Sequence, residues 1–451
     1  MKRVSLCLLS LLLCLSLLMA CSAPAVEAAP VEETRAPAAP PAEAAAPAEP
    51  TAQPPVASAA KRDGTEKNAQ YLNSRYEIVF NEDVVRSESL NSALEKLGLE
   101  PVLSGQGAAS VKDLLLSAIA AAEMTEFTLT YSEEKAAERL NAYGVTADAE
   151  AIAVELASAL DCGLIDVSEA TALAGADAAT KDDAINLFAR AIELSGRGRN
   201  FIGYSDDPDI ARRIYNAWSN IPRYDEPELR ELGLQGLLTG ITTGFLLMYE
   251  GFDAHFIPEL SMAYGQDSIA HAAQVLALLN REDMVVKVQL VPKISVYEYM
   301  LEWGPIPEPT PTYEVKTVEG RYFVHVFEYD MQMEFASREE MLRFNSIILE
   351  YAKKSGDNEE AVGLIRDSWW QPVYTTAKAN EMPEGDDEYR LIAQAIVSNG
   401  SGYYTRSGIL VDDMERVAEG LNALNPNCTC TTHEEWSDAA FYRYLTGEDY
   451  Q

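Results

Sequence analysis

Two cysteines and one histidine stand close together near the carboxyl end, at Cys428, Cys430 and His433. Thiolate and imidazole groups bind zinc, but a structural zinc site takes four ligands and uses Cys-x-x-Cys pairs. This group lacks a fourth ligand, and its Cys-x-Cys spacing would put both thiols on one face of a strand. We therefore expect no metal here. In an oxidising compartment we expect one of these cysteines to form a disulfide with Cys162.

Two other groups of polar residues could bind a cation but lack the required spacing. His255 and His271 are too far apart in the sequence to match a known ligand pattern. The acidic run at Asp206, Asp207 and Asp209 lacks the glycine and the distal glutamate of a calcium loop. We interpret the histidines as one solvated and one packed side chain, and the aspartates as a capped turn. The sequence thus predicts no metal and no cofactor.

Tryptophan side chains offer a different chemistry, because aromatic rings stack on the apolar faces of sugars. Trp369 and Trp370 are adjacent, and Trp303 and Trp436 could add to the same platform. Trp369 and Trp370 are therefore candidate ligand-binding residues. The alternative is that these rings are buried in a hydrophobic core.

The chain shows no motif for catalysis. It contains no Gly-rich phosphate loop, no nucleophile elbow and no His-Glu-x-x-His sequence, and no carboxylate pair stands out among its 71 acidic residues. These acids outnumber 35 Lys and Arg residues and give a net charge of −36. Nucleic-acid binding is excluded, because it needs basic side chains that displace counterions from phosphates. We predict no catalytic residue and a protein that is not an enzyme.

The first residues have the pattern of a bacterial export signal. Lys2 and Arg3 precede an apolar run over residues 6–18, which is shorter than the roughly 20 residues of a membrane span. The run ends in Leu-Met-Ala-Cys, which resembles a lipobox, the sequence at which a cysteine receives a lipid. We expect residues 1–20 to be removed and Cys21 to be lipidated, placing the protein on the outer face of the cell membrane. An ordinary secretory signal is the alternative.

Residues 21–64 are rich in Ala, Pro and Glu and contain no aromatic residue. Such a segment cannot bury enough apolar surface to offset the entropy of ordering the chain. We predict a disordered, extended tether. The rest of the 451 residues is long enough for two or three domains.

Helical periodicity is clear over residues 65–245. Capping boxes at residues 110–113 and 180–183 each begin an amphipathic helix, because a hydroxyl there can accept a bond from the backbone N–H three residues on. Upstream of each, another amphipathic segment ends at a glycine followed by leucine, at Gly98 and Gly163. This repeat predicts an all-α module of stacked helical pairs.

These repeats resemble S-layer homology (SLH) domains, in which a helix, a Gly-Leu stop and a loop precede a helix beginning Thr-Arg-Ala-Glu. Residues 179–184 are similar to that start, residues 110–113 form a looser version, and a partial third copy could begin at residues 204–208. The resemblance implies binding of cell-wall polysaccharide, partly through the arginine of the motif, at whose place we put Lys112 and Lys181. Lysine keeps the positive charge but lacks the planar pair of donors with which arginine binds a carboxylate. The alternative is therefore a helical scaffold that does not bind sugar.

Short predicted strands alternate with helices after residue 245. We divide this region into a small α/β unit at 246–304, a proline-rich linker at 305–312 and a C-terminal α/β lobe at 313–451. The expected fold class is mixed, with the all-α SLH-like module followed by a layered α/β or α+β region.

The function predicted from these patterns is that of a lipid-anchored surface protein without catalytic activity. Its expected partners are the membrane, through the N-terminal lipid, and cell-wall polysaccharide or another component of the envelope. A lipoprotein that binds a solute or glycan outside the cell is the first alternative, and an envelope hydrolase is the second. The sequence does not indicate an oligomeric state.

Overall fold

The computed structural model describes residues 59–145, 149–221, 223–266, 268–353, 365–366, 373–374 and 389–448. The predicted signal peptide, Cys21 and most of the predicted tether lie outside these ranges, as do Trp369 and Trp370.

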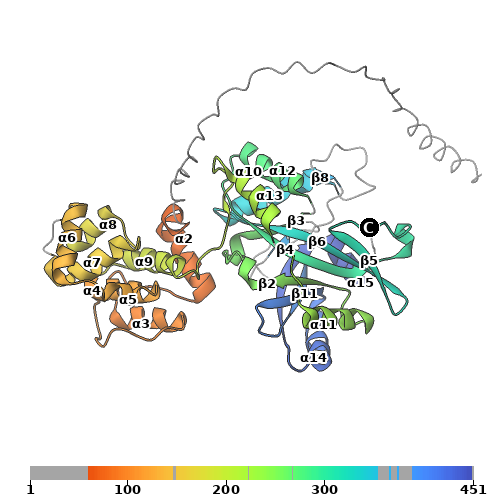
Figure 1. Ribbon diagram of the computed structural model, residues 1–451, viewed down its shortest axis with the longest axis horizontal. Helices are drawn as coiled ribbons and strands as arrows, with labels where there is room; N and C mark the ends of the chain where they lie inside the picture. Colours follow the sequence, from red (N-terminus) through yellow and green to blue (C-terminus); the bar gives the residue numbers. More distant parts are fainter. Residues whose placement is uncertain are drawn as a thin grey trace, which may run out of the picture. The chain divides into compact units, whose positions relative to one another are not determined.

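The helices of the first half share one hydrophobic core (Figure 1). Gly64, with a φ of 77°, interrupts the first of them, so that two short helices meet there. Leucine, isoleucine and alanine side chains make up most of this core. The helices are α2 (Ala59–Tyr76), α3 (Ser87–Lys96), α4 (Val111–Ala121), α5 (Thr125–Thr128), α6 (Glu133–Tyr143), α7 (Ala153–Asp161), α8 (Val167–Ala174) and α9 (Lys181–Leu194).

Local sequence signals set the boundaries of α4 and α9. Ser110 and Thr180 cap these helices, and each forms a complete capping box with the aspartate three residues on. Gly98 and Gly163 have φ values of 74° and 78°, a left-handed conformation that strains any residue with a Cβ atom. The left-handed backbone therefore favours glycine at these two helix ends, and the free backbone N–H groups favour a capping side chain at the two helix starts.

Three of these helices begin around a closed ring of backbone hydrogen bonds. The amide of Val85 donates to the carbonyl of Ala179 (3.1 Å), that of Ala179 to Ala109 (3.2 Å), and that of Ala109 to Val85 (2.8 Å). Val85 lies just before α3, Ala109 just before α4 and Ala179 just before α9. The ring makes the start of α3 a third equivalent of the two capped helices, whereas residues 204–208 lie next to the sheet.

The second half is built on an antiparallel sheet. Its strand order is β1-β4-β2-β11-β10-β12-β9-β3-β6-β5, and β4 also pairs with β6, so the sheet curves into a half-barrel. The two short strands β7 (Ala352–Lys353) and β8 (Ile365–Arg366) form a separate parallel pair. The strands of the half-barrel are β1 (Gly203–Tyr204), β2 (Gly244–Tyr249), β3 (Ser261–Gln266), β4 (Lys287–Glu298), β5 (Tyr313–Val318), β6 (Arg321–Glu334), β9 (Val373–Tyr374), β10 (Tyr389–Ser398), β11 (Tyr403–Ile409) and β12 (Thr429–Asp438).

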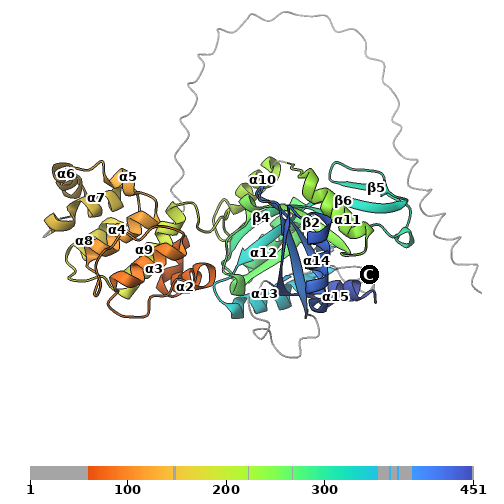
Figure 2. The ribbon, with the colours of Figure 1, turned by 90° about the horizontal axis from the view of Figure 1, so that it is seen from below.

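Helices cover one face of this sheet in two groups. The helices α10 (Ile210–Asn220), α12 (Ile269–Arg281) and α13 (Arg338–Tyr351) share a core with β3, β4 and β6. The helices α11 (Pro227–Leu238) and α14 (Met414–Leu424) pack beside β2 and β10 (Figure 2). The last helix, α15 (Ala439–Thr446), contacts β10 and β12.

The strands of the half-barrel carry apolar side chains on the covered face and polar ones on the other. On β4, Val288 and Leu290 enter the hydrophobic core, while the alternate residues Lys287, Gln289 and Lys293 are buried on the opposite face. A strand that is buried on both faces in this way shows polar or charged residues at several alternate positions of an otherwise apolar run.

The expected fold class is wrong. The finding that overturns a layered α/β or α+β region is the half-barrel, in which every described strand pair is antiparallel. The chain as a whole is mixed, with helices and one large antiparallel sheet. The alternation of strands and helices in the sequence did not indicate strand direction, because a helix can connect antiparallel strands as well as parallel ones.

The proline-rich segment 305–312 connects strands of one sheet. It lies between β4 and β5, and β4 pairs with β6 without interruption from Lys287 opposite Glu334 to Glu298 opposite Phe323. The segments that we assigned to a small unit and a C-terminal lobe therefore contribute neighbouring strands to the same half-barrel.

A charged cluster holds α6 against α7 and provides a test of the helical core. Asp161 accepts hydrogen bonds from Tyr131 Oη (2.5 Å), Tyr143 Oη (2.7 Å) and Arg139 Nη2 (2.5 Å). The Arg139 guanidinium and the two hydroxyls hold the pKa of this carboxyl well below its usual range. We expect Asp161→Ala to lower the free energy of unfolding by about 2 kcal/mol, because three partly buried donors lose a charged acceptor. Urea unfolding followed by circular dichroism measures this loss.

The matched control for that substitution is Asp177→Ala, which removes an exposed carboxylate from the loop before α9. It should change the free energy of unfolding by less than about 0.5 kcal/mol. Equal effects of the two substitutions would contradict the structural role of Asp161.

Candidate functional site

A cavity of about 620 Å³ lies where α2 meets the ends of β4 and β6. This volume falls within the range of small-molecule sites. We call it the α2 cavity. Its lining is rich in charged side chains and consists of Arg62, Asp63, Glu66, Lys67, Gln70, Tyr204, Leu260, Val285, Lys287, Glu334, Ala336, Ser337 and Arg338.

Buried ion pairs form the floor of the α2 cavity. Lys287 Nζ lies 2.6 Å from Glu334 Oε1 and 2.8 Å from Asp63 Oδ1. Arg199 Nε donates to Glu334 Oε2 (3.1 Å), and Lys67 Nζ lies 3.5 Å from Glu334 Oε1. The side chains of Arg199 and Glu334 are fully buried and that of Lys287 is 1% exposed. We call these five residues the Glu334 network.

The fold brings the members of this network together from distant parts of the sequence. Lys287 and Glu334 lie directly opposite each other on β4 and β6. Asp63 and Lys67 come from successive turns of α2, and Arg199 comes from the segment between α9 and β1. A single carboxylate on β6 therefore receives cations from three other parts of the chain.

The charges in the network shift the pKa values of its members. Burial would raise the pKa of Glu334, but the charges of Arg199, Lys287 and Lys67 lower it to about 2. Burial, followed by the charge of the neighbouring Lys287, lowers the pKa of Lys67 to about 8. Glu334 is thus a carboxylate at neutral pH, and Lys67 is a cation that loses its proton in mildly alkaline solution.

A second buried network occupies the polar face of the half-barrel. Lys293 Nζ lies 2.5 Å from Asp330 Oδ1 and 3.8 Å from Glu328 Oε1. Arg406 Nη2 binds both oxygens of Glu435, at 2.5 and 2.6 Å. Since these cations and carboxylates are buried against each other, the network is suited to ordering the interior of the sheet.

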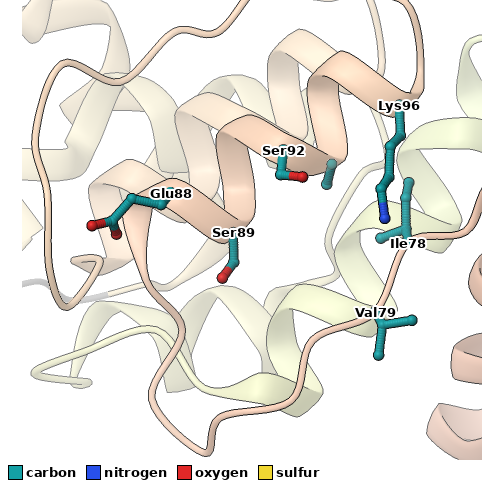
Figure 3. A pocket seen from close by; sticks show the side chains of 7 residues that line it. Ile78, Val79, Glu88, Ser89, Ser92 and Lys96 are labelled. Carbon is teal, nitrogen blue, oxygen red and sulfur yellow. The ribbon is translucent and has the colours of Figure 1, made fainter.

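A smaller pocket, of about 220 Å³, lies beside α3. Figure 3 shows Ser89 and Ser92 along the helix, with Glu88 near one end and Lys96 near the other. The Lys96 ammonium donates a hydrogen bond to the backbone carbonyl of Glu77, so this amine already has a partner. This pocket is therefore a weaker candidate than the α2 cavity.

The two lysines predicted to bind polysaccharide occupy different positions in their helices. Counted from the caps, Lys181 is the first residue of α9, whereas Lys112 is the second residue of α4 and Val111 is the first. Lys112 Nζ lies 3.2 Å from Glu155 Oε1 and donates to the carbonyl of Ala151. Lys181 therefore directly follows its cap, whereas Lys112 lies one residue further from its cap.

The predicted disulfide is absent from the structure. Cys162, Cys428 and Cys430 are free thiols, and burial raises the pKa of Cys430 to about 11. His433 Nε2 lies 3.6 Å from a Glu435 oxygen. Among the described residues, no group of three or more His, Cys, Asp or Glu side chains is placed to hold a metal ion.

The remaining candidates lie apart from the α2 cavity or serve as structural contacts. His255 Nδ1 lies 3.0 Å from the carbonyl of Gly198. Trp436 packs against the core shared by β3, β4 and β6, whereas Trp303 forms an edge contact with Tyr299. Asp207 and its acidic neighbours pair with arginines at the start of α10 and with Arg62.

The residues of the Glu334 network were missed at the sequence level. Asp63 was placed in the tether, although α2 begins at Ala59 and buries this carboxylate to 6% exposure. A signal for the other members was present, since Lys287 and Glu334 each stand in alternation with buried apolar residues. A buried charge in such a strand indicates a partner but does not identify it.

Comparison with known proteins gives no relative. No protein-family model matches the chain, no curated protein matches it, and no solved structure matches it. Within the described ranges, no helix has the length and apolar character needed to cross a membrane.

The Glu334 network predicts a large and pH-dependent effect of Glu334→Gln. The substitution leaves Lys287 and Arg199 without their shared carboxylate, and we expect a loss of roughly 3–5 kcal/mol in the free energy of unfolding at pH 7. The folded pKa of Glu334, about 2, lies below that of an unfolded glutamate, so its contribution is complete above about pH 4.5 and is lost as the pH falls toward 2. Urea unfolding at pH 7 and pH 2.5 measures both effects.

Glu138→Gln is the control, because Glu138 pairs with Lys135 on the surface and is 68% exposed. A surface pair contributes little. If the difference between Glu334→Gln and the native chain were the same at both pH values, the assigned charge state of Glu334 would be wrong.

Proposed function

We propose that this chain is an exported, lipid-anchored protein of the cell surface that binds cell-wall polysaccharide through residues 65–245 without catalysing a reaction. Cys21 carries the lipid in this proposal, and residues 1–20 are removed as the signal peptide. The proline-rich segment then separates the folded part of the chain from the membrane.

The observation that carries the proposal is the backbone ring that joins Val85, Ala109 and Ala179. It supports the interpretation of the helical region as a set of repeats, since three helix starts are held in equivalent positions around one centre. Repeats with the Gly-Leu stop and capped start of SLH domains are typical of modules that attach proteins to the cell wall.

Lys181 is the residue through which an acidic group of the polysaccharide would be bound. It is the first residue of α9, where the SLH motif has arginine, and it adds a positive charge to a helix start that already favours anions. Among the three equivalent starts, the first positions of α3 and α4 carry Ser87 and Val111 instead. The proposal therefore places one cationic contact in the module rather than three.

A second candidate function is the binding of a small solute outside the cell. The α2 cavity favours it, because its volume of about 620 Å³ suits an organic ligand and its lining is strongly charged.

According to this proposal, binding to the cell wall depends more on Lys181 than on Lys112. We expect Lys181→Ala to reduce retention of the purified chain on isolated wall sacculi several-fold, because a cation that faces the polysaccharide is lost. Lys112→Ala is the matched control, since its ammonium is held by Glu155. A sedimentation assay with sacculi, native or stripped of polysaccharide, measures retention. Equal retention on both preparations would contradict polysaccharide binding.

Anchoring by lipid predicts a separate outcome for Cys21→Ala. This variant should leave the membrane fraction and enter the soluble fraction of the producing cells, because it lacks the thiol that receives the lipid. Fractionation followed by immunoblotting measures the distribution. Continued partition of the variant with membranes would show that the lipobox assignment is wrong.

A further inference from the structure

We propose that the α2 cavity is a binding site for a small organic anion that carries a carboxylate or phosphate group. This site is separate from Lys181 and does not depend on wall binding by the helical repeats. The proposal rests on unpaired hydrogen-bond donors, on the balance of charges around the cavity and on its volume.

Some buried donor atoms around the cavity have no hydrogen-bond partner. Within the described residues, Arg199 Nη1 and Arg338 Nε are buried donors without a hydrogen-bond partner, whereas Arg199 Nη2 lies 3.4 Å from Asp63 Oδ2. The Arg199 side chain is fully buried against Asp63 and Glu334, two residues of the lining. A buried donor without an acceptor costs about 1–3 kcal/mol, and an anion in the cavity would supply an acceptor to Arg338, which is part of the lining.

The lining of the cavity contains more cationic side chains than carboxylates. Glu334 and Asp63 are shared by Lys287, Arg199 and Lys67, while Glu66 is exposed. The remaining lining cations are Arg62, which binds Asp206 and lies near Asp207 outside the lining, and Arg338. The lining therefore holds four cations, Arg62, Lys67, Lys287 and Arg338, against the three carboxylates of Asp63, Glu66 and Glu334, while Arg199 pairs with Asp63 and Glu334 without being part of the lining.

Arg338 and the start of α13 give the anion a defined place. Arg338 is the first residue of α13, and Ser337 Oγ accepts the backbone N–H of Glu340 at this helix start. Backbone N–H groups at a helix start favour negative charge. The guanidinium of Arg338 offers the planar donor pair that fits a carboxylate or phosphate.

Lys67 lies close to other cations, and this proximity helps to lower its pKa. Lys67 on α2 faces Lys287 on β4, Glu334 on β6, Asp63 on α2 and Arg199 before β1, and burial together with Lys287 lowers its pKa to about 8. A bound anion would favour the protonated form of Lys67. Anion binding should therefore weaken as the pH rises through about 8, since Lys67 then loses its charge.

The size and the apolar part of the lining favour an organic ligand over a bare inorganic ion. Leu260, Val285 and Ala336 contribute aliphatic surface to the cavity. A volume of about 620 Å³ is far larger than the roughly 30 Å³ that one water molecule occupies in the liquid. A ligand with an acidic group on a carbon skeleton fits this combination.

Isothermal titration calorimetry on the full chain tests the proposal with three probes: citrate, inorganic phosphate and uncharged glycerol. We expect saturable binding of one citrate or one phosphate per chain at pH 7, no binding of glycerol, and at least tenfold weaker binding of the same anion at pH 9.5. Tighter binding of citrate would assign the site to carboxylates, and tighter binding of phosphate would assign it to phosphate compounds.

Arg338→Gln locates the binding. We expect it to weaken the affinity for the preferred anion at least tenfold, with the circular dichroism spectrum and thermal midpoint unchanged. Arg212→Gln is the matched control, because it removes the same charge from an exposed site next to Asp209. Binding that is absent for both anions, that is insensitive to pH, or that falls equally in both variants would overturn the proposal, whatever the result with wall sacculi.

Discussion

The buried ion pair between Lys287 and Glu334 joins the sheet to helix α2 and to the segment before β1. The two residues lie opposite each other where β4 and β6 pair, so the contact fixes the register of the longest ladder in the sheet. The same carboxylate receives Arg199 and lies near Lys67, and Lys287 also binds Asp63. Charges removed from water are tolerated only when they are paired, so helix α2 has to pack where it does.

The half-barrel has its apolar side chains on the face covered by helices and a polar network on the other face. This arrangement is costly unless each buried charge has a partner. Lys293 pairs with Asp330 across the neighbouring strands β4 and β6, and Arg406 on β11 pairs with Glu435 on β12, with β10 between them. In a chain with a net charge of −36, basic residues are scarce, and several of them are buried in these two networks.

The proposed functions use different parts of this framework. Wall binding depends on the helix starts around the backbone ring, where Lys181 begins α9. Anion binding depends on the α2 cavity, where cations from α2, β4 and α13 converge. In an acidic protein, a site for an anion has to be shielded from the general negative field, and a cavity lined by buried cations meets that condition.

Features that depend only on neighbouring residues could be predicted from the order of the amino acids alone. The capping boxes at Ser110 and Thr180 and the stops at Gly98 and Gly163 follow from local backbone geometry, and they are present in the structure. Strand direction and the partner of Glu334 were decided only by the tertiary structure. Lys287 and Asp63 are far from Glu334 in the chain, and pairing across such distances depends on how whole elements pack, which no local pattern of residues encodes.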